Sequence, residues 1–154
     1  MAPRPPNDTG TGGGDLSGFV AALQRALCLG AVALYGSRGR GDHFPDSDYD
    51  FVVVSSSFDG LNPLRRREKP YEAWAATGPG RGADIFGLTP QELLAMESPL
   101  IWDMLEDGRP LFDDGVWRRA VAEFHRRKTA GYIIAVPGGW KMAERPAAEE
   151  PEDR

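Results

Sequence analysis

The segment from residue 36 to residue 50, GSRGRGDHFPDSDYD, constrains the fold of this chain more than any other. It lies between two short apolar runs, 31–35 (AVALY) and 51–54 (FVVV), of the kind that form buried β-strands. A glycine-serine turn therefore follows one expected strand, and two acidic residues lead into the next. Both halves of the segment are expected at strand ends, next to one another.

Asp48 and Asp50 lie two positions apart at the entry to the second expected strand. Successive side chains of a strand point to opposite faces, so these two carboxylates share a face and Tyr49 lies on the other. Such close like charges repel one another unless a cation lies between them. Because oxygen ligands select a hard ion, the pair predicts a Mg2+ site.

Gly36 and Ser37 predict a phosphate site beside these carboxylates. A glycine lets the backbone approach a ligand closely, and a helix that begins there offers free amide groups which, with the Ser37 hydroxyl, bind phosphate. The alternative is that the glycines only form a turn, which Asp46 and Asp48 cap. That alternative does not explain why Asp50 opens an apolar strand.

The order of Gly-Ser, ten residues and Asp-x-Asp resembles the motif of the DNA polymerase beta nucleotidyltransferase superfamily. It is most similar to the minimal nucleotidyltransferase branch with its MntA-type antitoxins, which commonly reads GSRARG and then PDSD-x-D. Here residues 36–41 read GSRGRG, with Gly39 in place of alanine, and residues 45–50 read PDSDYD. The resemblance covers about residues 16–113 and implies an α+β fold, in which helices pack on a small mixed β-sheet.

A third carboxylate lies on a later strand in that superfamily, and Asp84 within the apolar run 82–88 is the candidate. The alternative is a solvent-facing aspartate on an edge strand. The following residues, 89–92 (TPQE), form a capping-box pattern with proline at the first helical position. They resemble the strand-TPEEL segment of the same branch. Helices are therefore expected over 16–29, 90–97 and 114–128.

The resemblance implies a two-metal Mg2+ site with ATP as the donor. The residues expected to hold the metals and carry the catalysis are Asp48, Asp50 and Asp84, with Asp84 near the acceptor hydroxyl. Gly36 and Ser37 are expected to bind the β- and γ-phosphates. Arg38 and Arg40 are expected to add positive charge at the phosphates.

With 154 residues and 41% hydrophobic content, the chain can build one domain. Residues 15–142 are expected to form it, with a C-terminal helix, between disordered tails at 1–14 and 143–154. Cys28 falls in the expected first helix, which predicts a buried thiol. Residues 131–142 have no assigned role. Neither a signal peptide nor an apolar stretch of membrane-spanning length is seen, which predicts a cytoplasmic protein.

A net charge of −5, with 23 acidic against 18 basic residues, argues against binding of long nucleic acid. The local basic cluster at 65–69 is interpreted as a solvated face, with the triphosphate or an acidic partner as the alternative. Many short members of the resembled family are encoded beside HEPN-domain toxins, which they adenylylate. The resemblance thus implies AMP transfer to a hydroxyl of such a partner. Two alternatives remain open: an aminoglycoside-type transferase for small molecules, and a non-catalytic partner-binding module.

Overall fold

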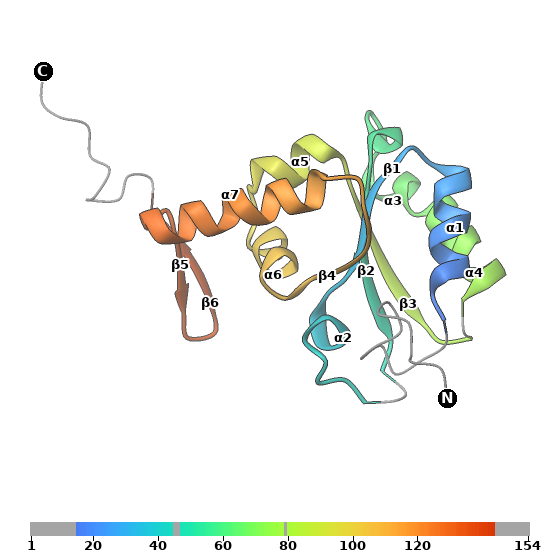
Figure 1. The fold of residues 1–154 in the computed structure, drawn as a ribbon, viewed down its shortest axis with the longest axis horizontal. Helices are drawn as coiled ribbons and strands as arrows, with labels where there is room; N and C mark the ends of the chain where they lie inside the picture. Colours follow the sequence, from blue (N-terminus) through green and yellow to red (C-terminus); the bar gives the residue numbers. More distant parts are fainter. Residues whose placement is uncertain (1–14, 45–46, 79, 144–154) are drawn as a thin grey trace, which may run out of the picture.

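A four-stranded mixed sheet forms the centre of the fold (Figure 1). The computed structural model describes residues 15–44, 47–78 and 80–143. In the order β3-β2-β1-β4, β1 is antiparallel to β2 and to β4, whereas β2 and β3 are parallel. The strands are β1 (Leu29–Leu34), β2 (Tyr49–Ser55), β3 (Ala83–Leu88) and β4 (Arg109–Asp113). This architecture confirms the predicted α+β class.

Helices cover both faces of the sheet, which explains why β2 is apolar almost without interruption (Figure 1). One face carries α1 (Ser17–Ala26) and α4 (Glu68–Thr77), and the other carries α5 (Pro90–Ala95), α6 (Pro99–Asp107) and α7 (Val116–Ala130). The short elements between strands are α2 (Gly36–Arg40), η2 (Ser56–Phe58) and α3 (Pro63–Arg66).

Strand alternation divides the hydrophobic core into two layers. Toward α1 and α4, Phe51 packs between Phe19 and Trp74, with ring centroids 4.8 and 5.2 Å away. Toward α5–α7, Val52 and Val54 pack in the layer that also contains the tryptophans of α6 and α7. Full burial of one such side chain contributes about 1.5–3 kcal/mol. β2 is therefore packed against a hydrophobic layer on each of its faces.

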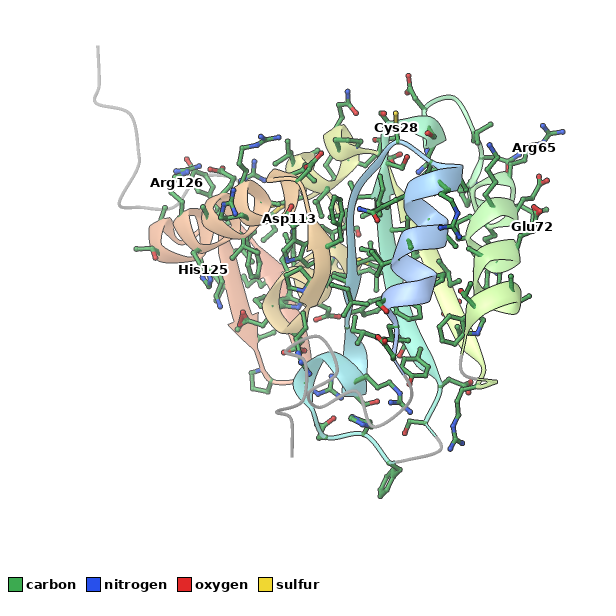
Figure 2. All side chains as sticks on the ribbon, turned by 45° about the vertical axis from the view of Figure 1, so that its right-hand side comes forward. Cys28, Arg65, Glu72, Asp113, His125 and Arg126 are labelled. Atoms are coloured by element: carbon green, nitrogen blue, oxygen red, sulfur yellow. The ribbon has the colours of Figure 1, made fainter. Side chains whose placement is uncertain are left out.

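The first helix ends three residues earlier than expected, and this changes the position of Cys28. α1 stops at Ala26, Leu27 is extended, and β1 begins at Leu29. Cys28 lies exposed in the connection (Figure 2), so the predicted burial of its thiol is wrong. The backbone of Cys28 is fixed by a hydrogen bond, in which its N–H donates to Ser57 Oγ at 2.9 Å.

Residues 131–142, which had no assigned role, contain the hairpin of β5 (Ile133–Val136) and β6 (Gly139–Met142). Trp140 anchors it to the body of the protein: its Nε1 donates to Asp103 Oδ1 at 2.7 Å, and its ring lies 5.8 Å from that of Phe124. Across the described ranges, no helix is long and apolar enough to cross a membrane. The predicted tails fall almost entirely outside the described residues.

Candidate active site

The phosphate-loop residues and all three predicted carboxylates lie at one end of the central sheet. Gly36 is the second residue after the end of β1, and Asp50 is the second residue of β2. Because β1 and β2 are antiparallel and β2 and β3 are parallel, the end of β1 meets the beginnings of the other two strands. Asp84, the second residue of β3, therefore arrives at the same place from 34 positions further along the chain.

Asp50 and Asp84 are direct partners in the parallel register of β2 and β3. Each lies in step with the apolar residues of its strand that face α5–α7, so the two carboxylates share one face of the sheet. Burial raises the pKa of Asp50 above its ordinary value, and the charges of Asp84 and then Asp48 raise it further. The three carboxylates thus act on one another electrostatically.

Asp48 lies just before β2 and is exposed. A Cβ atom on Gly82 would lie 2.7 Å from Asp48 Oδ1, so the carboxylate occupies space that only a glycine leaves beside β3. The Asp84 side chain is 63% exposed, and its Oδ1 lies 3.7 Å from Arg67 Nη2. Asp84 is therefore open to solvent, and the guanidinium of Arg67 lies beside it.

Gly36 serves two purposes at the turn out of β1. Its φ of +64° is in the left-handed region that favours glycine, and a Cβ there would lie 2.8 Å from Asp50 Oδ2. Ser37 follows in the first turn of α2, where its half-buried hydroxyl makes no hydrogen bond to the described part of the protein. The backbone of this turn therefore approaches Asp50 closely, and the residue that follows it carries a hydroxyl.

Arg38 and Arg40 lie on different sides of α2, as the helical rotation between residues two apart requires. Arg38 is fully buried: its guanidinium lies 3.8 Å from the Tyr49 ring centroid, and its Nη2 donates to the Ser47 carbonyl at 2.8 Å. Arg40 is exposed and pairs with Asp42 at 3.0 Å and Asp107 at 3.6 Å. The structure thus gives Arg38 a positioning contact, and the expected contribution of Arg38 and Arg40 to charge at the phosphates stays a prediction.

The fit of a divalent cation rests on two observations. First, the negative charges of Asp84 and Asp48 lie close enough to Asp50 to raise its pKa. Second, the absence of a side chain at Gly36 leaves space beside Asp50 Oδ2. Among the described residues, no three acidic, histidine or cysteine side chains converge as a closed metal-binding group. The residues thus fit a hard cation in charge and chemistry, as an open group of carboxylates and not as a complete cage.

Tyr35 belongs to this site, although no motif in the sequence pointed to it specifically. Its N–H donates to the Asp50 carbonyl at 3.0 Å. Burial raises the pKa of the Tyr35 hydroxyl to about 12, and the charges of Asp50 and Asp84 add to the effect. The hydroxyl thus stays protonated near these carboxylates. Its position immediately before the glycine-serine turn was the available signal.

This combination of fold and site is that of a nucleotidyltransferase. Residues 16–92 match the nucleotidyltransferase domain family, and the chain belongs to that family. The predicted enzyme class is therefore confirmed. No curated protein matches the sequence.

Several solved structures resemble the chain in fold. A toxin-antitoxin complex with AMP-PNP has a TM-score of 0.55 and 16% identity, over 75% of this chain and 87% of that one. A mutant of the MntA-HpeT toxin-antitoxin has a TM-score of 0.53 and 14% identity, with the same coverages of 75% and 87%. A tri-AMPylated HEPN toxin in complex with an MNT antitoxin, from Shewanella oneidensis, gives 0.44 and 15%, over 71% and 83%. At such identities, the first two show a shared fold.

Proposed function

We propose that this nucleotidyltransferase transfers AMP from ATP to a hydroxyl group of a partner protein, with Mg2+ as cofactor, and that it acts as the antitoxin of a HEPN-domain toxin. The observation that carries the proposal is the pairing of Asp50 with Asp84 beside the Gly36 turn. This arrangement combines a place for phosphate with carboxylates that can hold a cation.

The donor triphosphate would bind at the turn between β1 and α2. Gly36 leaves the backbone accessible there, and the Ser37 hydroxyl can donate to a phosphate oxygen. Arg38 would hold α2 in place through its contacts with Ser47 and Tyr49 at the start of β2. The solved toxin-antitoxin complex with AMP-PNP, which shares the fold, supports ATP as the donor.

Asp48 and Asp50 would hold Mg2+, and Asp84 would join them on the acceptor side. When bound, the metal supplies neutralisation of phosphate charge and lowers the pKa of the attacking hydroxyl. The protein's own contribution is orientation, because the β2–β3 register keeps Asp84 fixed relative to Asp50.

A partner protein is the proposed acceptor because the acceptor side of the site is open. Asp84 is 63% exposed and lies on β3, which is an edge strand of the sheet. A hydroxyl on the surface of another protein can therefore approach it. The shared fold with a MntA-HpeT toxin-antitoxin supports this class of acceptor.

AMP transfer to the product of the adjacent gene tests the proposal. The purified proteins are incubated with ATP labelled at the α-phosphate and Mg2+, and the partner is analysed by mass spectrometry for added AMP. Asp50→Asn and Asp84→Asn should each abolish transfer, whereas Asp59→Asn, an exposed aspartate outside the site, should leave it unchanged. Transfer that persists in both site variants would overturn the proposal.

Two other results would favour the alternatives. Label that is found only on an added aminoglycoside would indicate a small-molecule transferase. Complex formation without transfer, by a protein that binds neither ATP nor Mg2+, would indicate a partner-binding module.

A further inference from the structure

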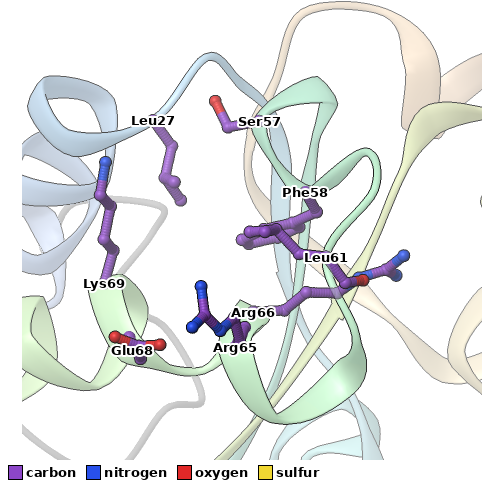
Figure 3. A pocket seen from close by; sticks show the side chains of 8 residues that line it. All are labelled: Leu27, Ser57, Phe58, Leu61, Arg65, Arg66, Glu68 and Lys69. Atoms are coloured by element: carbon purple, nitrogen blue, oxygen red, sulfur yellow. The ribbon is translucent and has the colours of Figure 1, made fainter.

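A cavity of about 150 Å³ lies at the other end of β2 from the carboxylates, between the end of α1, η2 and the connected helices α3 and α4 (Figure 3). From Asp50 to Ser55 the strand alone covers about 17 Å. The cavity is therefore separate from the candidate active site. The residues that line it are Leu27, Ser57, Phe58, Leu61, Arg65, Arg66, Glu68 and Lys69.

The inner wall of this cavity is apolar. Leu27 and Phe58 are 8% and 1% exposed and belong to the core layer beneath α1 and α4, and Leu61 is half-buried against the same layer. Their positions are set by the core, so the wall is preformed. An apolar cavity of about this volume can hold a body the size of benzene.

The rim of the cavity carries two cationic side chains, Arg65 and Lys69, that form no ion pair within the described residues. Arg65 lines the cavity but is exposed, and its guanidinium extends outward at the mouth (Figure 2), whereas Arg66 extends to its partner Glu92, at 2.6 Å. In the part of the chain that the structure describes, the side chains of Arg65 and Lys69 have no ion pair or hydrogen bond.

Ser57 and Glu68 complete the polar groups of the rim. Ser57 Oγ accepts the Cys28 N–H at 2.9 Å, which leaves its own O–H free to donate to a ligand. Glu68 opposes one of the two cations, so the rim retains a single net positive charge. This balance favours a singly charged anion over a phosphate dianion.

We propose that this cavity binds a small organic carboxylate whose apolar body is about the size of a benzene ring. The body lies against Leu27, Phe58 and Leu61, and the carboxylate accepts hydrogen bonds from Arg65, with Lys69 and Ser57 beside it. A guanidinium fork matches the two oxygens of a carboxylate, and such charge-assisted hydrogen bonds are the strong ones. The site is independent of the nucleotide site and of the proposed transfer reaction.

Titration of the full chain with benzoate, followed by calorimetry and by NMR shifts of the residues that line the cavity, tests this inference. Arg65→Gln and Lys69→Gln should each weaken benzoate binding about tenfold, since each removes a charged donor. Lys141→Gln, on the β5–β6 hairpin, should leave the affinity unchanged. Glu68→Gln should tighten binding because it removes the opposing charge, a gain that misfolding cannot produce.

Two comparison ligands separate the contributions of charge and apolar body. Benzyl alcohol keeps the ring without the charge, and inorganic phosphate keeps a charge without the ring, so both should bind at least about tenfold more weakly than benzoate. Three results would each overturn the inference: no benzoate binding by the unmodified protein, equal affinity in Arg65→Gln, or benzyl alcohol or phosphate binding as tightly as benzoate.

Discussion

The buried guanidinium of Arg38 lies 3.8 Å from the ring centroid of Tyr49, on the residue that separates the two carboxylates of the motif. The same guanidinium donates to the Ser47 carbonyl through Nη2, at 2.8 Å, and through Nε, at 3.2 Å. One side chain thus fastens α2 to the chain just before Asp48. The glycine-serine turn and the carboxylates are therefore joined by a buried contact as well as by the strands.

Arg38→Lys should destabilise the protein by about 2–3 kcal/mol, because an ammonium cannot reproduce the planar stacking and the paired donation to Ser47 in a buried place. Urea unfolding measures the change. Arg40→Lys, on the exposed side of the same helix, should change stability by less than about 0.5 kcal/mol. Equal effects of the two variants would contradict the positioning role.

Gly39→Ala should destabilise the fold by about 1 kcal/mol or more, although alanine favours helices. A Cβ at this position would lie 2.7 Å from the Asp107 carbonyl oxygen and 2.9 Å from that of Leu34. Both are backbone atoms, which cannot rotate away, so α2 and α6 would have to separate. This contact explains glycine where the resembled motif has alanine.

The matched control for this change is Gly139→Ala in β6, where a Cβ would meet nothing within 4 Å. Thermal unfolding of the two variants should show a lower midpoint for Gly39→Ala alone. A midpoint for Gly39→Ala at or above that of the unmodified protein would show that α6 does not restrict position 39.

Mg2+ should stabilise the unmodified protein more than its carboxylate variants. At ten times the Kd, bound Mg2+ would add about 1.4 kcal/mol to the free energy of unfolding, which should disappear in Asp50→Asn. Without metal, Asp50→Asn should be as stable as the unmodified protein or more so, because repulsion from Asp84 and Asp48 is removed. Thermal melts with and without Mg2+ measure both effects.

Asp59→Asn, remote from the site, should retain the full Mg2+ effect. If Asp48→Asn, Asp50→Asn and Asp84→Asn all gained as much stability from Mg2+ as the unmodified protein, these carboxylates would not be the metal ligands.

Glu92 should make the fold sensitive to acid. Hydrogen bonds from Arg66 lower the pKa of Glu92 below its ordinary value of 4.5, and the Thr89 N–H also donates to its carboxylate, at 2.8 Å. Because the folded-state pKa is lowered, this contribution to stability is complete above pH 4.5 and is lost as the pH falls through the folded-state pKa.

Unfolding measured between about pH 6 and about pH 3, an interval that contains the ordinary pKa values of carboxylates, should therefore show a shallower loss of stability in Glu92→Gln. Glutamine can still accept from the Thr89 N–H in a capping box, so the helix start is preserved. Glu97→Gln, at an exposed position just after α5, is the control and should follow the unmodified protein. An unchanged pH profile in Glu92→Gln would contradict the role of the Arg66 pair.

The sequence alone determined those features that depend on neighbouring residues. Alternation along a strand predicted a common face for Asp48 and Asp50, and the Thr89 capping box begins α5 where the pattern predicts. These follow from the backbone geometry of a few consecutive residues. Together with the resemblance of residues 36–50 to the nucleotidyltransferase motif, they predicted the fold class and the enzyme class.

Only the tertiary structure decided which distant segments meet and which side chains they bury. The register that sets Asp84 opposite Asp50 depends on how β3 packs beside β2, and the burial of Arg38 depends on α2 closing over the entry to β2. Cys28 was misplaced for the same reason, since α1 ends where the chain must turn into β1. Register and burial are properties of contacts between segments far apart in the chain, and no local periodicity encodes them.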